Sequence, residues 1–382
     1  MTSLLVTNDF PPKIGGIQSY LWELWRRLPP DETTVMTTPY SGDRAWDAEQ
    51  EFRIVRRREP VLLPTPALAR DIDALAREVG ADVIFLDPAL PLGLIGARLT
   101  AAPWVVVVHG AEITVPGRLP SKPLLRRVLR GAAGIVAAGG YPLAEAERAA
   151  GRPLPSLVVP PGIDPVRFRP PVDAAERSAA RQTLGLDPDA RIILGASRLV
   201  PRKGFDVMID ALSRLPADVQ LVIVGGGRDQ ARLEQRARSL DLTERVQFLG
   251  RVSDEELPLA HRAADLFAMV CRDRWVGLEA EGFGIVFLEA GASGLACVAG
   301  RSGGSDEAVL DGETGLVVAP RDPNAVAVAI RELLDDPGRR AAMGAAARRH
   351  AEAEWSYDER VGPLARLAAG DFSGLVGGRK GQ

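Results

Sequence analysis

Short runs of apolar, mostly β-branched residues alternate along the chain with segments of helical spacing. This alternation limits the possible folds more than any other feature. The first series of runs covers residues 4–7, 33–37, 53–55, 83–86, 105–108, 135–137 and 157–159. The second series covers residues 192–195, 221–224, 246–249, 266–270, 296–299 and 315–318. Most runs are continuously apolar, as expected for strands buried on both faces of a parallel sheet. The pattern therefore predicts an α/β protein.

The two series of strands predict two Rossmann-like domains, which suits a length of 382 residues at about 150 residues per domain. Residues 160–188 contain six prolines and fit a linker better than a sheet. We predict an N-terminal domain at 1–168 and a C-terminal domain at 169–350. We further predict a helix at 351–370 that returns to the N-terminal domain and a loose tail at 371–382.

The composition excludes several classes of protein. Hydrophobic residues make up 46% and charged residues 25%, as in soluble globular proteins and unlike disordered chains. A formal charge of −3 gives no overall positive excess that would indicate a nucleic-acid partner. The two cysteines cannot form a disulfide scaffold, which favours a reducing, cytoplasmic setting. The apolar runs are far shorter than the ~20 residues that span a bilayer, and the first residues do not resemble a signal peptide.

A glycine pair lies where the first predicted strand passes into a helix. The strand ends at Thr7, the helix begins near Ile17, and Gly15 and Gly16 lie just before it. Glycines here would let backbone N–H groups approach an anion at the positive end of the helix. The alternative is a turn that needs glycine only for its backbone conformation.

Three cations follow the strand at residues 192–195, in the segment SRLVPRKGF. They are Arg198, Arg202 and Lys203. Open α/β sheets bind ligands at the carboxyl ends of their strands, and arginine and lysine both bind phosphate oxygens. The position indicates a diphosphate site, with a solvated basic loop as the alternative.

Two glutamates are separated by seven residues in EGFGIVFLE. Glu281 is expected in a loop before a helix that starts near Ile285, and Glu289 in the second turn of that helix. A carboxylate can accept hydrogen bonds from sugar hydroxyls, and first-turn N–H groups can face phosphate. The alternative is two unrelated solvated glutamates. However, the apolar flanks would bury Glu289, which would then need partners.

A histidine directly follows the apolar run at residues 105–108. His109 lies where α/β enzymes place reactive side chains. The alternative is a structural histidine whose hydrogen bonds are satisfied within the fold.

A basic stretch at residues 118–130 contains no acidic residue and has leucines and valine at helical spacing. Its cations include Lys122, Arg126, Arg127 and Arg130. Such a helix could attach to an anionic membrane surface. The alternative, slightly favoured by the sequence alone, is a domain helix that packs its apolar stripe against the sheet.

Four features in this order resemble the retaining GT-B glycosyltransferases of family four, over nearly the whole chain. They are the Gly15-Gly16 turn, Arg198 with Lys203, the glycines at 225–227, and the glutamate pair. TNDFPPKIGGIQSYL, SRLVPRKGFD, DLFAMVCRDR and EGFGIVFLEAGASG are similar to the actinobacterial phosphatidylinositol mannoside mannosyltransferases of that family. The resemblance implies a GT-B fold, with two Rossmann-like parallel-sheet domains that face each other across a cleft. It also implies transfer of mannose from GDP-mannose to phosphatidylinositol monomannoside through an α-1,6 linkage, in phosphatidylinositol mannoside biosynthesis.

The resemblance also implies site residues. Arg198 and Lys203 would hold the donor diphosphate, with Gly15 and Gly16 approaching it from the other domain. The donor sugar, ribose and guanine would contact Glu281, Gly282, Phe283, Gly284, Ile285, Val286, Glu289 and Val252, the ribose being bound by Glu289 and guanine by the Val252 backbone. Asp9 and Gln18 would bind the acceptor. The predicted catalytic set is His109, Arg198, Lys203 and Glu281. Because the cations stabilise the departing diphosphate, neither a metal nor another cofactor is expected.

The implied partners are a nucleotide-sugar donor and a lipid-linked acceptor at an anionic membrane surface, with no nucleic acid. The lipid acceptor favours membrane contact by Lys122, Arg126, Arg127 and Arg130. A protein of this kind is expected at the inner face of the cell membrane, and the sequence leaves its oligomeric state open. One alternative is a family-four transferase with another donor or a soluble acceptor. A more distant one is a GT-B protein that binds or epimerises nucleotide sugars without transfer. Two segments differ from the family pattern, His109-Gly110-Ala111-Glu112 and the loop at 273–279.

Overall fold

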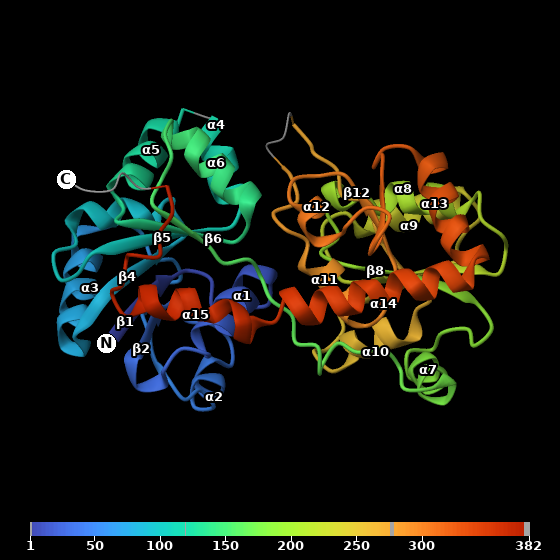
Figure 1. The fold of residues 1–382 in the computed structure, drawn as a ribbon, viewed down its shortest axis with the longest axis horizontal. Coiled ribbons are helices and arrows are strands. Elements are labelled where there is room, and N and C mark those ends of the chain that lie inside the picture. The colour runs from blue at the N-terminus through green and yellow to red at the C-terminus, as the bar shows by residue number, and fades with distance from the viewer. Residues whose placement is uncertain (1, 119, 276–278, 378–382) are drawn as a thin grey trace. The chain divides into compact units, whose positions relative to one another are not determined.

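The computed structural model describes residues 2–118, 120–275 and 279–377, and the chain divides into two compact units (Figure 1). The N-terminal unit contains the chain up to Pro161 together with the chain from Tyr357 onward. The C-terminal unit is Gly162–Ser356. Each unit is built on one parallel sheet, which confirms the predicted α/β class.

The sheet of the N-terminal unit has seven strands in the order β3-β2-β1-β4-β5-β6-β7. The strands are β1 (Thr2–Thr7), β2 (Thr33–Thr37), β3 (Arg53–Arg56), β4 (Ala81–Asp87), β5 (Trp104–Val108), β6 (Gly134–Ala137) and β7 (Ser156–Val158). The helices are α1 (Gly16–Trp25), α2 (Asp43–Asp47), α3 (Pro66–Val79), α4 (Ala111–Arg118), α5 (Lys122–Gly131), α6 (Gly140–Ala150) and α15 (Tyr357–Ala368), with 3-10 turns η1 (Pro30–Glu32) and η2 (Leu92–Arg98).

Side chains of this sheet alternate between two buried faces. Leu5 packs into a core that contains residues of α1 and α15, whereas Leu4 and Val6 pack on the other face with residues of α3. Burial on both faces explains why the strands are continuously apolar instead of alternating apolar and polar residues.

The sheet of the C-terminal unit has six strands in the order β10-β9-β8-β11-β12-β13. They are β8 (Arg191–Ala196), β9 (Val219–Val224), β10 (Val246–Gly250), β11 (Leu266–Met269), β12 (Cys297–Gly300) and β13 (Gly315–Val318). The helices are α7 (Ala174–Thr183), α8 (Phe205–Leu212), α9 (Gln230–Ser239), α10 (Glu256–Ala263), α11 (Ile285–Ala292), α12 (Ser305–Ala308), α13 (Pro323–Asp335) and α14 (Pro337–Glu354), with the 3-10 turn η3 (Pro201–Lys203).

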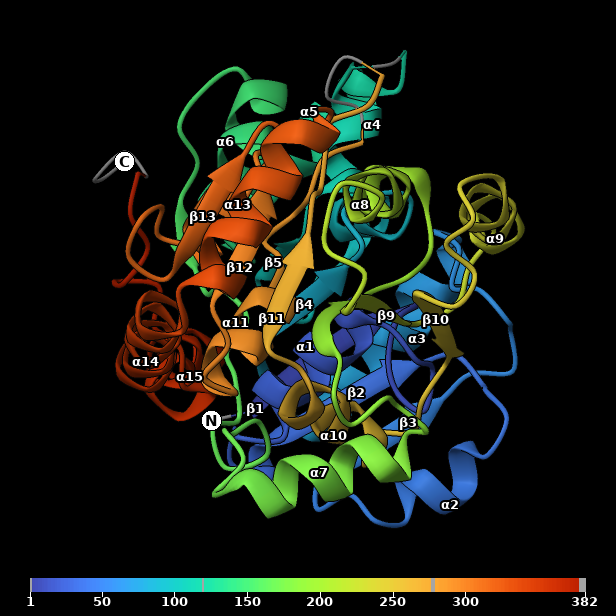
Figure 2. The ribbon, with the colours of Figure 1, turned by 90° about the vertical axis from the view of Figure 1, so that its right-hand side faces the viewer.

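Two groups of helices cover the two faces of this second sheet. Figure 2 shows these helices around the sheet. One core contains buried residues of α8, α9 and α13, and the other contains residues of α7, α10, α11 and α14. Successive strand residues again go to opposite cores: Ile193 packs in one core, and Ile192 and Leu194 pack in the other.

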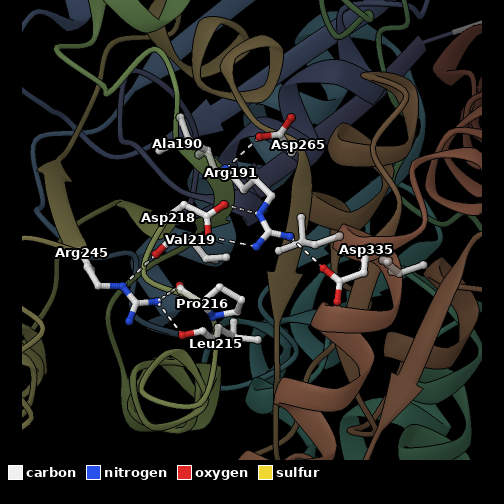
Figure 3. Close-up of polar contacts among 12 residues, drawn as sticks. Ala190, Arg191, Leu215, Pro216, Asp218, Val219, Arg245, Asp265 and Asp335 are labelled. Carbon is white, nitrogen blue, oxygen red and sulfur yellow. Dashed lines mark hydrogen bonds and ion pairs between the residues drawn. The ribbon is translucent and has the colours of Figure 1, made fainter.

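Arginines join the loops at the amino end of the C-terminal sheet (Figure 3). At the first residue of β8, Arg191 lies 2.7 Å from Asp218 and 2.9 Å from Asp335 at the end of α13. Arg245 donates hydrogen bonds to backbone carbonyls, at 3.0 Å from Val219 and 2.7 Å from Pro216. These contacts stabilise the loops at the amino ends of the strands. The candidate site lies at the opposite edge of the sheet, at the carboxyl ends of the strands.

The boundaries of the two units differ from the predicted ones at 168 and 350. Ile163 and Phe168 are buried in the core of the C-terminal unit, so the change of unit comes earlier, at Pro161. At the other end, α14 continues to Glu354 within the C-terminal unit. The predicted helix at 351–370 is therefore divided between the end of α14 and α15 of the N-terminal unit.

The described part of the segment predicted as a loose tail, residues 371–377, is held against the N-terminal unit. Val376 exchanges backbone hydrogen bonds with Ser156 of β7 at 2.9 Å, and Leu375 packs against the N-terminal core. Residues 378–382 of the predicted tail lie outside the described residues. None of the helices in the described ranges has the length and apolar character needed to cross a membrane.

A glycine in α14 permits close packing of this helix against the end of α11 and yields a stability prediction. A Cβ atom on Gly344 would lie 2.1 Å from the carbonyl oxygen of Gly294. We expect Gly344→Ala to lower the free energy of unfolding by about 1–3 kcal/mol because the packed backbones must separate. Gly338→Ala on the same helix is the control, since its Cβ would meet nothing closer than 3.4 Å. Urea unfolding followed by circular dichroism measures both; equal stability of the two variants would contradict the packing argument.

Candidate functional site

The basic segment after β8 forms a tight turn against the end of β11. Gly204 has φ of +74°, and a Cβ atom there would lie 2.1 Å from the carbonyl oxygen of Val270. Only glycine fits this combination of backbone conformation and close approach. The turn directs Lys203 inward, where it is only 6% exposed.

The buried Lys203 ends at the carboxylate of Glu281. Its Nζ lies 2.6 Å from Glu281 Oε2, and Arg202 Nη1 lies 2.7 Å from the same oxygen. The Sγ of Cys271, just after β11, donates to Oε2 as well, at 3.2 Å. One carboxylate oxygen thus faces two cations and a thiol. The Lys203–Glu281 cluster, as we call Arg202, Lys203, Cys271 and Glu281, has one net positive charge.

This arrangement changes the proton affinities of the acidic groups in the cluster. Burial alone disfavours a charged carboxylate, but Lys203 and Arg202 outweigh it and hold the pKa of Glu281 at about 2. Burial and the charge of Glu281 raise the pKa of the Cys271 thiol. At neutral pH Glu281 is therefore ionised, and Cys271 is a neutral hydrogen-bond donor.

A glycine-containing loop after β12 holds the backbone of Glu281 in place. Ser302 Oγ accepts a hydrogen bond from the Glu281 N–H at 3.2 Å, and the Gly304 N–H donates to the Glu281 carbonyl at 2.9 Å. Gly303 has φ of +51°, and a Cβ atom on it would lie 2.0 Å from that carbonyl. These contacts fix the loop before α11 and hence the direction of the carboxylate.

Helix α11 begins at Ile285, directly after Gly284 in the left-handed conformation, and no side chain caps it. Its first-turn N–H groups, at residues including Ile285 and Val286, are therefore available to a ligand. Glu289 lies in the second turn and is partly buried. Its carboxylate has no hydrogen-bond or ion-pair partner among the described residues. The described residues thus do not supply the hydrogen-bond partners that the sequence led us to expect for Glu289.

Arg198 makes no hydrogen bond or ion pair with the Lys203–Glu281 cluster. Its side chain is exposed and has no partner within the described part of the chain. The backbone beside it packs against the glycines at 225–227: Cβ atoms on Gly225 and Gly227 would lie 2.0 and 2.2 Å from the carbonyl oxygens of Ser197 and Leu199. Val252, predicted to contact guanine, follows β10 and is partly buried.

Three neighbouring strands of the N-terminal unit end in a hydrogen-bonded row. Thr7 of β1 donates its hydroxyl to Asp87 Oδ2 of β4 at 2.7 Å. His109, which follows β5, places Nε2 2.9 Å from Asp87 Oδ1. Burial lowers the pKa of His109, but the Asp87 carboxylate and two other nearby acids outweigh it and raise the pKa. The ring of Tyr20 in α1 meets the His109 ring edge-on, with 5.3 Å between the centroids.

The predicted acceptor residues lie beside this row. Gln18 Nε2 donates to Asp9 Oδ1 at 2.6 Å, and the Asp9 N–H donates to the Thr7 hydroxyl at 2.8 Å. Burial and the charge of Asp87 raise the pKa of Asp9. Gly16 is exposed at the first residue of α1, and the space around it is open. In the segment that differs from the family pattern, Glu112 accepts hydrogen bonds from the backbone N–H groups of His109 and Gly110.

Helix α5 packs its apolar stripe in the N-terminal unit. Leu125, Val128 and Leu129 are buried in the N-terminal unit, as expected for a domain helix. Arg126 and Arg130 donate to the carbonyls of Ala149 and Ala150, at the end of α6. Lys122 and Arg127 have no partner within the described residues, so they are the cations that remain available to a surface.

Sequence reasoning missed several residues of these sites. The structure adds Arg202, Cys271 and Ser302 to the C-terminal site, and Thr7 and Asp87 to the N-terminal row. Arg202 was visible as one of three cations, but its inward direction depends on η3. Asp87 directly follows an apolar run in the sequence, and this position at a strand end could have identified it as a candidate site residue. Residues 276–278 of the loop that differs from the family pattern lie outside the described residues. Across 2–118, 120–275 and 279–377, no group of three His, Cys, Asp or Glu side chains could hold a metal.

Two family models match the chain, one in each unit. The model described as Glycosyltransferase Family 4 matches residues 14–167, and the model described as Glycosyl transferases group 1 matches residues 176–350. A GDP-mannose-dependent alpha-(1-6)-phosphatidylinositol monomannoside mannosyltransferase of Mycolicibacterium smegmatis is 41% identical over 380 residues, which covers 96% of this chain and 98% of the relative. The chain belongs to the family 4 glycosyltransferases.

Other relatives of this family 4 glycosyltransferase extend the comparison. A Corynebacterium glutamicum protein is named as the mannosyltransferase of monoacylated alpha-(1-6)-phosphatidylinositol monomannoside; it is 39% identical, over 93% of this chain and 94% of the relative. A D-inositol 3-phosphate glycosyltransferase of Xylanimonas cellulosilytica is 40% identical, but over only 54% of this chain and 49% of the relative. The crystal structure of Anabaena HepE has a TM-score of 0.82 at 23% identity, covering 97% of this chain and 100% of HepE. That likeness confirms the predicted fold class.

Glu289 gives the site a pH-dependent effect on stability. Burial and the charge of Asp254 raise the pKa of Glu289 to about 7, against the opposing effect of Arg167. Between the ordinary value of 4.5 and this raised value, the folded state binds more protons, so the free energy of unfolding falls as pH rises. We expect Glu289→Gln to be more stable than the parent at pH 8 and nearly equal to it at pH 5. Urea unfolding at both pH values measures this, with exposed Glu244→Gln as the control; a constant difference at the two pH values would contradict the assignment.

Proposed function

We propose that this glycosyltransferase moves mannose from GDP-mannose to phosphatidylinositol monomannoside and forms an α-1,6 linkage, as a step of phosphatidylinositol mannoside biosynthesis. One observation carries the proposal: identity of 39–41% over 93–96% of the chain to relatives named for this reaction. Because these matches span both units, they include the candidate donor and acceptor sites together.

The Lys203–Glu281 cluster is the proposed donor site. Arg202 and Lys203 would turn their positive charge to the diphosphate and stabilise it as the sugar departs, where charge develops in the reaction. The Oε1 atom of Glu281 has no hydrogen-bond partner among the described residues, so it can accept a hydrogen bond from a sugar hydroxyl. The exposed Arg198 would add a further phosphate contact.

The remaining donor contacts are proposed for the start of α11 and its surroundings. The backbone at residues 282–286 would face the donor sugar and phosphate. Glu289, which has no hydrogen-bond partner of its own, would accept hydrogen bonds from the ribose hydroxyls. The Val252 backbone would contact guanine. Since Arg202 and Lys203 supply the positive charge, we propose that transfer requires no metal ion.

The N-terminal unit is proposed to hold the acceptor. Asp9, already oriented by Gln18, would accept a hydrogen bond from an acceptor hydroxyl, and His109 would lie near the reacting sugar. Gly15 and Gly16 would admit a phosphate close to the backbone at the start of α1.

We further propose that the protein works at the inner face of the cell membrane and contacts it through α5. Lys122 and Arg127 lack partners within the described residues, and Leu124 on the same helix is 49% exposed. Free cations beside an exposed apolar side chain suit an anionic lipid surface.

The direct test of the substrates is a panel of GDP-mannose and other nucleotide sugars against phosphatidylinositol, phosphatidylinositol monomannoside and D-inositol 3-phosphate, with and without a chelator. We expect an α-1,6-mannosylated lipid only from GDP-mannose and the monomannoside, at an unchanged rate with the chelator. Product on inositol phosphate would favour a soluble acceptor. Bound but unconsumed nucleotide sugar would contradict transfer.

The proposed diphosphate contact predicts the effect of Lys203→Met. Methionine keeps most of the buried volume, and Arg202 still pairs with Glu281, so the fold should persist. Loss of one charge-assisted contact should cost roughly 1.5–3 kcal/mol, or at least about tenfold in kcat/KM. Arg238→Ala, at the exposed end of α9, is the control and should retain the parent rate. Near-parental turnover of Lys203→Met would exclude the diphosphate role.

The proposed membrane contact predicts weaker vesicle binding by the double variant Lys122→Glu, Arg127→Glu. Each basic residue near an anionic surface contributes about 1 kcal/mol, so reversing two should weaken binding by more than about tenfold. The measurement is co-sedimentation with vesicles that contain phosphatidylinositol, compared with phosphatidylcholine alone. Arg238→Glu, Arg349→Glu makes the same change in net charge on exposed residues elsewhere. Equal loss in both variants would indicate a net-charge effect instead of contact by α5.

A further inference from the structure

The buried carboxylate of Asp87 lies at the centre of the row formed by three strand ends in the N-terminal unit. Strands β1, β4 and β5 are adjacent in the sheet, and Thr7 is the register partner of Asp87. Asp87 is 1% exposed. Its two oxygens are both occupied, one by the Thr7 hydroxyl at 2.7 Å and the other by His109 Nε2 at 2.9 Å.

A buried carboxylate needs a compensating positive charge as well as hydrogen bonds. The Thr7 hydroxyl is neutral, and the ammonium of Lys13 bonds to the Asn8 carbonyl and the Thr38 hydroxyl instead. His109 is therefore the group in contact with Asp87 that can provide the charge.

The other ionisable groups around the imidazole reinforce this requirement. Asp9 follows β1, and Glu112 of α4 accepts the backbone N–H of His109. Both are acidic and favour a protonated ring, whereas Lys13 is the basic group near Asp9. Tyr20 of α1 contributes only an aromatic edge, because its hydroxyl donates to the Val159 carbonyl at 2.6 Å. The charges on this edge thus favour the imidazolium form.

The two nitrogens of the His109 ring have different surroundings. Nε2 faces Asp87, while Nδ1 has no hydrogen-bond partner among the described residues. Nδ1 is therefore the ring nitrogen that is left for a hydrogen bond with a ligand. When Nε2 donates to a carboxylate, the ring orientation is fixed and the imidazolium offers its Nδ1–H to an oxygen acceptor.

We propose that Asp87 is the positioning residue of His109: it holds Nε2–H toward the protein interior and so presents a charged Nδ1–H donor to an oxygen of a sugar bound at this edge of the N-terminal sheet. The inference rests on the proposed mannosyl transfer for the identity of that sugar, but the pairing itself does not. Thr7 extends the same control to the acceptor side, since its hydroxyl accepts the Asp9 N–H at 2.8 Å while donating to Asp87.

The test is the titration of His109 in the intact chain, followed by NMR of 13C-labelled histidine. The chain has three histidines, and the spectrum of His109→Gln identifies the signal. In the parent protein we expect His109 to titrate above its ordinary value of about 6.5. Asp87→Asn keeps the size and hydrogen-bonding capacity of the side chain but removes the charge, so it should lower the midpoint by at least about one pH unit. The alkaline fall of kcat for mannose transfer should move by the same amount.

Two control variants separate positioning by Asp87 from general effects. Glu112→Gln removes a nearby charge that does not touch the ring, and should shift the His109 midpoint less than Asp87→Asn does. Tyr20→Phe keeps the aromatic edge and should leave the midpoint unchanged. A shift in Asp87→Asn no larger than that in Glu112→Gln would overturn the proposal, as would a parent midpoint below the ordinary value even if Asp87→Asn failed to fold.

Failure of the proposed function and failure of the Asp87–His109 pairing give different results. If His109 titrates as expected but the parent transfers no mannose from GDP-mannose, the proposed function is wrong and the Asp87–His109 pairing stands. If the midpoint moves in Asp87→Asn while the pH dependence of kcat stays in place, His109 does not act in transfer and the positioning role is excluded.

Discussion

The buried carboxylate of Glu281 must be compensated by positive charge, and the C-terminal site is built around this constraint. A buried ion is tolerated only when partners surround it. Lys203 and Arg202 supply the charge. Gly204 lets the loop after β8 pack closely against the end of β11, and Gly303 lets the loop after β12 pack closely against the backbone of Glu281. A ligand that uses these cations must compete with Glu281 for them. Such competition favours a group with more than one negative charge, such as a diphosphate, over a neutral or singly charged one.

The N-terminal unit also has a buried carboxylate that needs a compensating positive charge. Asp87 is the buried acid, and His109 is the cation whose charge responds to its surroundings. In both units these buried charges lie at the carboxyl ends of two neighbouring strands in the middle of the parallel sheet. Thr7 and Asp87 end the neighbours β1 and β4, and Lys203 and Cys271 follow the neighbours β8 and β11. Sheet topology thus brings together residues that are far apart in the sequence.

Much of this could be predicted from the sequence because it depends on local pattern. Continuous apolar runs identified both sheets, and the glycines before Ile285 located the start of α11. Other features depend on contacts that only the fold determines. The ion pair of Arg202 with Glu281 follows from the direction of the turn η3. The role of Asp87 requires knowledge that β4 lies beside β1, a pairing between residues 80 positions apart. The change of unit at Pro161 depends on where Ile163 and Phe168 are buried.

We propose that the Lys203–Glu281 cluster binds the diphosphate of a guanine nucleotide. The most direct measurement is calorimetric binding of GDP and GMP to the parent and to Lys203→Met. We expect the parent to bind GDP at least about tenfold more tightly than GMP, since the second phosphate gains a charge-assisted contact. We also expect the variant to lose most of this difference. An equal preference for GDP in both proteins would contradict the claim, because the second phosphate would then be bound elsewhere.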